Sequence, residues 1–182
     1  LQAFTTANLS ALSTQQIVAL TTVQVQALRT TQVQYLATAQ VAAMTTDQIV
    51  ALGVAQARVI GSAQAQALTT VQLVALQTED LAELATVSVR ALGTVQVLAL
   101  TTDQLAALTT AQIVGMTTAQ VAVWSTDQVL SLTTQQVASL STLNTSALTT
   151  SQIAALETRD VLALTTINLQ VWSSAQIASL TT

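Results

Sequence analysis

Histidine, cysteine, proline and lysine are all missing from this chain of 182 residues. Without histidine or cysteine it has no imidazole base, no thiol nucleophile, no disulfide and none of the common zinc ligands apart from carboxylates. Without lysine it cannot form a Schiff base with a carbonyl compound. We therefore expect no enzyme, no catalytic residue, no metal or cofactor site and no small-molecule substrate.

Charged residues are scarce as well, with four basic and eight acidic side chains and a formal net charge of −4. The four arginines, Arg29, Arg58, Arg90 and Arg159, are widely spaced along the chain. Binding to a nucleic-acid backbone requires clustered basic side chains that neutralise several phosphates. We expect no nucleic-acid partner.

Long hydrophobic runs are the third absence, although the mean hydropathy is +0.59. A Thr-Thr pair, or a related pair, interrupts each apolar run well before the roughly 20 residues that a membrane-spanning helix needs. We therefore expect no transmembrane segment.

What the chain does contain is a strict period of eight residues. Leucine or a close substitute recurs every eighth residue from Phe4 through Leu12 to Leu180, without an insertion. The full octad reads Leu-Thr-Thr-x-Gln-(Val/Ile/Leu)-x-Ala, as in residues 148–155. A short strict period is typical of a quasi-one-dimensional array, in which each unit contacts only its neighbours. The sequence predicts one continuous array over residues 1–182.

The two ends of the sequence resemble the middle of the array. The chain starts at Leu1 without an initiator methionine, and Thr182 lies two residues into a new octad. Neither end carries an atypical capping unit, which an isolated array would need to cover its apolar ends. We expect this array to be a segment of a longer chain, or to stack on copies of itself.

Neither a continuous helix nor a continuous strand suits this period. Eight residues at about 100° each rotate a leucine seam by roughly 80° per octad, so the apolar stripe of one long helix would spiral away. In a strand, Leu12 and Ile17 are an odd number of residues apart and would point to opposite faces. Short, interrupted helices fit better, because the Thr-x-x-Gln pattern, as at Thr21 and Gln24, is a capping box that starts a helix.

The sequence therefore predicts an all-α solenoid of very short helices, one per octad. Leu, the Val/Ile residue and Ala are expected to line its interior, with Thr, the variable residues and part of the Gln set outside. A single octad buries too little apolar surface to offset the ordering of its backbone, so the octads must pack on one another. The alternative is a β-solenoid with ladders of Gln and rows of Thr. Ala-rich units with few Gly and no Pro provide poor corners for such a fold.

Several irregularities interrupt the pattern, and we interpret each as structural. Gly53 and Gly61 replace Thr at the start of their octads and mark the stretch of lowest expected stability. Around residue 145 a core Val is replaced by Thr, and Leu143 is a candidate to compensate. Some side chains of the same type recur 32 residues apart, as for Val18 and Val50, which four octads per superhelical turn would explain.

Charged and aromatic departures are likewise interpreted without a ligand. Acidic residues just after the Thr pairs are expected to favour the helix dipole, and two short charged clusters are interpreted as solvated helix starts rather than a Ca²⁺ site, because they lack the loop of alternating acids with a central Gly. Two tryptophans in the Leu position are interpreted as oversized core residues. The acids after the Thr pairs are Asp47, Asp103 and Asp127. One charged cluster is Glu79, Asp80 and Glu83, and the other is Glu157, Arg159 and Asp160. The tryptophans are Trp124 and Trp172.

The stretches Leu-Thr-Thr-Asp-Gln-Leu-Ala-Ala-Leu, residues 100–108, and Leu-Thr-Thr-Ala-Gln-Ile-Val, from Leu108, resemble the octad tracts of large repetitive secreted proteins of bacteria. Such proteins are often labelled adhesin-like or calcium-binding-like, and the resemblance covers essentially the whole chain. It implies a secreted or cell-surface location, a stalk or filament role and no catalytic residues.

These observations favour a non-enzymatic structural protein that forms or extends an extracellular filament or stalk, with copies of itself as the expected partner. The alternative is an adhesive or ice-binding surface that presents rows of Thr.

Overall fold

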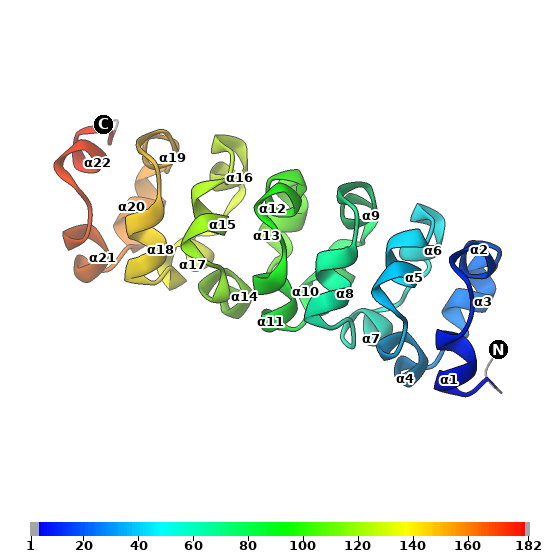
Figure 1. The fold of residues 1–182 in the computed structure, drawn as a ribbon. Coiled ribbons are helices and arrows are strands. Elements are labelled where there is room, and N and C mark those ends of the chain that lie inside the picture. The colour runs from blue at the N-terminus through cyan, green and yellow to red at the C-terminus, as the bar shows by residue number, and fades with distance from the viewer. Residues whose placement is uncertain (1–3, 181–182) are drawn as a thin grey trace. The chain divides into compact units, whose positions relative to one another are not determined.

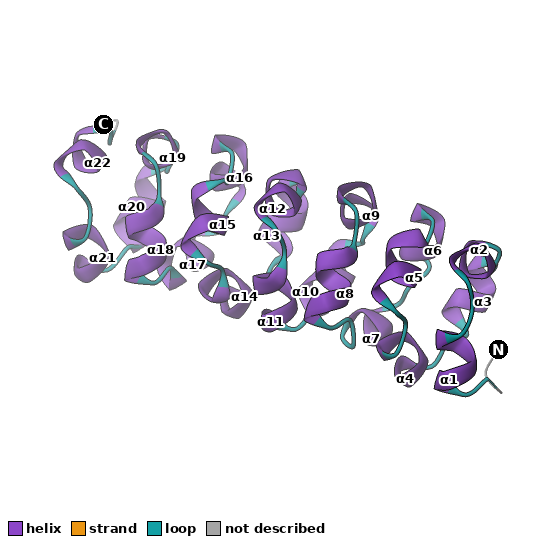
Figure 2. Ribbon diagram, in the orientation of Figure 1, coloured by secondary structure: helices purple, strands orange, loops and turns teal. Residues whose placement is uncertain are grey.

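A computed structural model describes residues 4–180, and within this range the chain forms 22 short α-helices and no strand. Figure 2 shows the regular alternation of helix and loop. The predicted all-α architecture with one short helix per octad is confirmed. The helices are α1 (Thr6–Ser10), α2 (Thr14–Val18), α3 (Thr22–Gln26), α4 (Thr30–Gln34), α5 (Thr38–Ala43), α6 (Thr46–Val50), α7 (Val54–Ala57), α8 (Ser62–Ala67), α9 (Thr70–Ala75), α10 (Thr78–Glu83), α11 (Thr86–Ala91), α12 (Thr94–Ala99), α13 (Thr102–Ala107), α14 (Thr110–Gly115), α15 (Thr118–Ala122), α16 (Thr126–Ser131), α17 (Thr134–Ser139), α18 (Thr142–Ala147), α19 (Thr150–Ala154), α20 (Thr158–Ala163), α21 (Thr166–Gln170) and α22 (Ser174–Ala178).

Where a Thr pair directly follows the Leu position of a described octad, the first Thr is the N-cap and the helix begins at the second, as the capping-box pattern predicts. At α13, Thr101 adopts an extended backbone, and its hydroxyl oxygen accepts a hydrogen bond from the backbone N–H of Gln104 at 3.1 Å. The Oε1 atom of Gln104 in turn accepts one from the backbone N–H of Thr101 at 3.1 Å. This reciprocal pair satisfies two N–H groups that the start of a helix leaves without partners.

No helix end in the described chain depends on a glycine with positive φ or on a proline. At the end of α13, Leu108 is extended, with φ −60° and ψ 141°, and its N–H donates to the carbonyl of Leu105. Leu108 and the extended Thr109 that follows it therefore end α13 and connect it to α14. Among residues 4–180 no residue has a positive φ, so the connection requires no glycine.

The contacts divide the chain into two compact units, residues 1–92 and 93–182, and each unit is a solenoid of short helices. Within the first unit each helix packs on the third one along the chain, as α2 on α5, α5 on α8 and α8 on α11. The second unit repeats this pattern with α13 on α16, α14 on α17 and α17 on α20. In Figure 1, the first unit has α2, α6 and α9 along one edge and α1, α4 and α11 along the other.

The core consists of the Leu and Val/Ile residues, as predicted. Val97 and Leu105 are completely buried, and Leu100 and Leu108 nearly so. The Ala before each Leu is mostly half-buried and lies at the margin of this core. The larger difference from the prediction concerns glutamine, because the Gln side chains from Gln32 onwards are mostly buried rather than partly outside.

The superhelical turn is shorter than the four octads that we inferred from side-chain spacing. Hydrogen bonds between successive turns join residues 28 apart, as from Gln48 to Leu20 and from Gln72 to Met44. The same glutamines also bond over 30 and 31 residues, and the helices pack on the third helix along the chain rather than the fourth, so one turn takes between three and four octads and the prediction of four is wrong. The prediction of four octads was based on the octad position that Val18 and Val50 occupy. That position is not buried in any described octad, so the residue types found there do not depend on how the turns pack.

The octads that contain Gly53 and Gly61 each still form a helix. Gly53 and Gly61 occupy the N-cap positions of α7 and α8 with negative φ, and neither provides a side-chain cap. At four residues, α7 is the shortest helix of the described chain. A Cβ atom at Gly53 would meet nothing within 4 Å. The glycine is therefore not required by the backbone or by crowding.

We expect Gly53→Thr to stabilise the first unit by about 1 kcal/mol, because it adds a capping hydroxyl and reduces the conformational entropy of the unfolded chain. Chemical denaturation followed by circular dichroism measures the change. A destabilised Gly53→Thr variant would contradict the assignment of this residue as an ordinary N-cap.

Truncating a core leucine tests the interior of the solenoid. Leu105→Ala on α13 should lower the free energy of unfolding by about 3 kcal/mol, because Leu105 is completely buried. The matched control Leu98→Ala on α12 removes a side chain that is 53% exposed and should change the stability by less than about 0.5 kcal/mol. Equal losses in the two variants in urea denaturation would refute this assignment of inside and outside.

Candidate functional site

The most distinctive chemistry of the chain lies in its glutamine row, which we call the Gln slot: the fourth residue after each Leu or its substitute. Gln48 in α6 is 2% exposed and bonds in two directions. Its Oε1 atom accepts from the backbone N–H of Thr45 at 2.9 Å. Its Nε2 atom lies 2.8 Å from the carbonyl oxygen of Ile17, 3.2 Å from that of Val18 and 2.7 Å from that of Leu20, all at the end of α2. One amide thus joins the start of one helix to the end of a helix in the preceding superhelical turn.

The same arrangement recurs in both units. In the second unit, Nε2 of Gln136 lies 3.2 Å, 3.1 Å and 2.7 Å from the carbonyl oxygens of Leu105, Ala106 and Leu108. Gln16 and Gln24 in the first turn form the capping box but are exposed. The buried members with the same inter-turn bonds include Gln40, Gln56, Gln64, Gln72, Gln128 and Gln152.

This bond stabilises the fold because the helices are short. Helices of four to six residues leave most of their terminal N–H and C=O groups without a partner inside the helix. Burying such groups without hydrogen bonds lowers the stability of the folded chain. A primary amide carries both an acceptor and a donor, so it satisfies an N–H on one helix and carbonyls on another.

One serine and two asparagines that replace glutamine in this slot keep the donor. The Oγ atom of Ser88 donates to the carbonyl of Ile60 at 2.8 Å. The Nδ2 atom of Asn144 lies 3.1 Å from the carbonyl oxygen of Met116, and that of Asn168 lies 2.7 Å from that of Leu140. Each of these bonds spans 28 residues, as the glutamine bonds do.

We did not predict this role from the sequence, although the sequence contains a signal for it. A capping box accepts Glu as readily as Gln. The Gln slot nevertheless holds Gln, Asn, Ser or Asp and never Glu in this chain. A position that needed only the capping acceptor would admit Glu.

Two aspartates occupy the same slot, and both are buried to 1% exposure, so the interpretation of their clusters as solvated helix starts is wrong for these two residues. Asp160 accepts a hydrogen bond from the hydroxyl of Thr134 at 2.7 Å. Asp80 has no such donor, and its Oδ2 atom is buried without a hydrogen-bond partner. Burial, and secondarily the negative charge of Glu79, raise the pKa of Asp80 to about 6.

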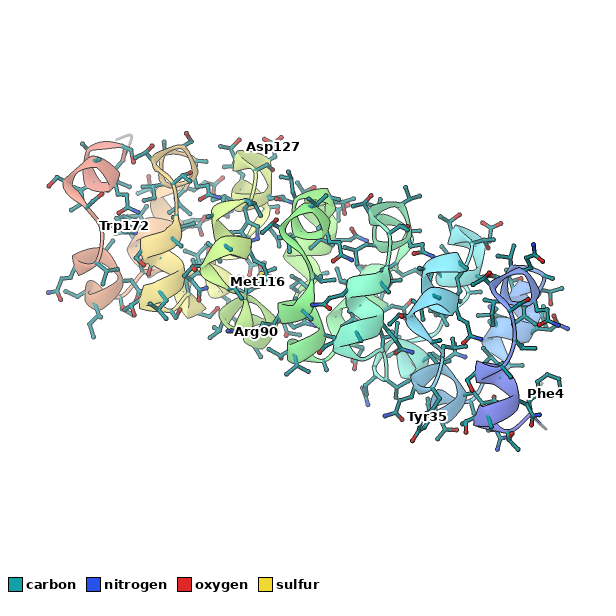
Figure 3. All side chains as sticks on the ribbon, viewed as in Figure 1. Phe4, Tyr35, Arg90, Met116, Asp127 and Trp172 are labelled. Atoms are coloured by element: carbon teal, nitrogen blue, oxygen red, sulfur yellow. The ribbon has the colours of Figure 1, made fainter. Side chains whose placement is uncertain are left out.

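The remaining charged residues lie on the surface. Glu79 and Glu157 are exposed, and Arg58, the C-cap residue of α7, donates through Nε to Glu83 on α10 at 2.9 Å. The aspartates predicted at helix starts, Asp47, Asp103 and Asp127, lie in the first turns of α6, α13 and α16. Figure 3 shows Asp127 and Tyr35 projecting outward from their helices. Within residues 4–180, no group of three or more acidic side chains is arranged to hold a metal ion.

The two tryptophans are core residues, as predicted. Trp124 and Trp172 are both buried, and Trp172 donates through Nε1 to the carbonyl of Thr145 at 3.0 Å. Leu143 does not compensate for the missing Val at position 145, because its side chain is 69% exposed. The hydroxyl of Thr145 is satisfied by polar contacts instead, donating to Ser141 O at 2.7 Å and accepting from Asn168 Nδ2 at 3.1 Å.

The first unit also contains a hollow of about 960 Å³ beside Gly53 and Ala55, where small residues replace the larger ones of other octads. Its polar walls include Arg29, Thr30 and Gln77. It contains no acid, thiol or imidazole, so it offers hydrogen bonds but no proton-transfer or nucleophilic group apart from hydroxyls. No helix among the described residues is long and apolar enough to cross a membrane.

Comparison with known proteins identifies the repeat. The model of one protein family, the ALTTAQ repeat, matches the chain five times, at residues 1–30, 24–54, 73–110, 105–134 and 153–182. The six letters of that name occur literally at residues 107–112. No curated protein and no solved structure matches the chain.

Alanine substitution at two glutamines separates capping from the bond between turns. Gln16→Ala removes only a capping interaction and should lower the free energy of unfolding by about 1 kcal/mol. Gln48→Ala also leaves the carbonyls at the end of α2 without their donor and should lower it by about 1–3 kcal/mol more. Urea denaturation of both variants measures the difference, and equal losses would show that the inter-turn bonds contribute nothing.

Proposed function

We propose that this chain, which belongs to the ALTTAQ repeat family, is a non-enzymatic structural segment that forms or lengthens an extracellular filament or stalk through association between copies. The observation that carries the proposal is the Gln slot. Each added octad with a Gln brings an acceptor for its own helix start and a donor for a helix end 28 to 31 residues earlier. Such a contact has no built-in limit to its repetition.

We propose that copies associate through the amides of Gln16 and Gln24. These are the same groups that are buried against helix ends in later turns. A helix end from a second copy, seated on Gln16 and Gln24, would reproduce the contact that Gln48 makes with α2.

A non-enzymatic role and an extracellular location rest on the sequence. The chain lacks histidine, cysteine and lysine, which removes most nucleophilic and acid–base chemistry. The resemblance to octad tracts of secreted bacterial surface proteins favours a secreted or cell-surface location.

A surface that binds ice or another flat ligand through Thr rows receives less support. The hydroxyl of the first Thr of a pair is engaged with its own helix, as Thr101 accepts from the Gln104 N–H. That engagement fixes the hydroxyl orientation for capping rather than for an external ligand.

Sedimentation velocity over a range of protein concentrations tests self-association. The chain should form larger species as concentration rises, and Gln16→Glu with Gln24→Glu should weaken the association constant about tenfold or more, because Glu keeps the capping acceptor but lacks the donor and brings charge against carbonyl oxygens. Gln15→Glu with Gln26→Glu is the matched control, since it adds the same charges at exposed positions of the same two helices. A chain that stays monomeric at high concentration would refute the proposal, as would equal weakening by both pairs.

A further inference from the structure

Glutamine, serine and asparagine in the Gln slot donate a hydrogen bond to an earlier turn, and Asp80 has a hydrogen to donate only when its carboxyl is protonated. Ser88, Asn144 and Asn168 each donate to the carbonyl 28 residues earlier. The asparagine bonds of 3.1 Å and 2.7 Å show that a side chain of this length reaches the carbonyl. Aspartic acid has the shape of asparagine, but a carboxylate has two acceptors and no donor.

Asp80 lies in this slot on α10. The bonds of the octads on either side of it show which earlier carbonyl each residue of the slot faces. The Nε2 atom of Gln72 lies 2.6 Å from the carbonyl oxygen of Met44, and the Oγ atom of Ser88 lies 2.8 Å from that of Ile60. Both bonds span 28 residues, so the same register places Asp80 against the carbonyl of Leu52, just past the end of α6. The Oδ2 atom of Asp80 is buried without a hydrogen-bond partner.

We propose that Asp80 is a proton-dependent bond between superhelical turns: the neutral carboxyl donates its hydrogen to the Leu52 carbonyl, and the ionised carboxylate loosens α10 from the end of α6. In the ionised form, carboxylate and carbonyl oxygens face each other without a hydrogen between them. Two buried acceptors in that arrangement repel, and the carboxylate also loses its hydration. In this octad the carboxyl hydrogen therefore forms the bond between turns that an amide hydrogen forms in the octads with Gln.

The second aspartate of the slot shows which neighbour would remove this dependence. Asp160 accepts a hydrogen bond from Thr134, which lies 26 residues earlier. The residue 26 positions before Asp80 is Val54, which has no hydroxyl. Asp160 has a donor that stabilises its carboxylate, and Asp80 lacks the corresponding one.

The surrounding charges do not replace that donor. The Arg58 guanidinium donates to Glu83 through Nε at 2.9 Å and through Nη2 at 2.5 Å. The nearest charge in the sequence, that of Glu79, acts with burial to raise the pKa of Asp80 to about 6. The charged groups on the elements around Asp80 are Glu79 and Glu83 on α10, Arg58 at the C-cap of α7, Asp47 on α6 and Arg90 on α11.

The direction of the pH effect follows from this raised pKa. The folded chain binds the proton roughly 100-fold more tightly than an unfolded chain with the ordinary value of 3.8. The stability that the neutral carboxyl contributes is therefore fully present below about pH 4 and is lost as the pH rises through about 6. The first unit should be held less firmly at α10 in neutral solution than in mildly acidic solution.

Thermal unfolding of the full chain between pH 4 and pH 8 tests the proposal with three variants. For the native sequence, the Asp80 contribution should lower the melting temperature by about 5 °C between pH 5 and pH 8. Asp80→Asn, which donates at every pH, should remove this decrease and melt higher than the native sequence at pH 8. Asp47→Asn, which neutralises an exposed aspartate, should retain the decrease. Equal pH dependence of the native and Asp80→Asn chains would overturn the proposal.

A second measurement keeps the test independent of whether Asp80→Asn folds normally. The ¹³Cγ resonance of Asp80 should titrate with a midpoint near pH 6, and Val54→Thr should move that midpoint to lower pH by supplying the hydroxyl that Thr134 supplies to Asp160. A midpoint near 4 in the native chain would overturn the proposal. So would loss of the pH dependence on adding millimolar Ca²⁺, since a cation rather than a proton would then lie between the oxygens.

Discussion

The bond from a glutamine amide to the end of a helix in the preceding superhelical turn is the interaction on which the solenoid depends. A helix of five or six residues has almost no internal hydrogen-bond ladder and is unstable alone. Its unsatisfied groups are concentrated at its two ends. Gln48 satisfies one N–H at the start of α6 and contacts three carbonyls at the end of α2 with a single side chain. The hydrophobic core provides the driving force for packing, and the amides fix which helix end lies against which helix start.

The same interaction helps to explain how only eight residues form a helix, its cap and the connection to the next helix. Six residues or fewer form each helix, and an extended Leu and Thr connect it to the next one. The Leu side chain of the connection fills the core, so the connection itself contributes to packing. The Thr caps the next helix, and the Gln both completes that cap and bonds to the earlier turn. Seven or nine residues would change the angle at which each amide meets the earlier helix end, which is consistent with the absence of any insertion from Phe4 to Leu180.

The features that the sequence predicted correctly are those determined within a few residues. The Thr-x-x-Gln capping box, the helix boundaries and the burial of Leu and Val depend on neighbours in the same octad or the next, and the structure has them as predicted. The second bond of each glutamine depends on a residue 28 positions away, and no local pattern reveals it. For the same reason the sequence did not predict a turn of fewer than four octads, and the buried aspartates Asp80 and Asp160 were interpreted as solvated. The absence of Glu from the Gln slot was the one local signal, because it indicates that most octads use the donor of this side chain as well as its capping acceptor.

Hydrogen exchange of the glutamine side-chain amides, measured by NMR, tests the central claim most directly. If the inter-turn bonds exist, the Nε2 hydrogens of Gln48 and Gln72 exchange far more slowly than those of Gln16 and Gln24, which share the capping box but are exposed. Equal exchange rates at all four glutamines would contradict the account, because the capping interaction alone would then describe the role of glutamine in this repeat.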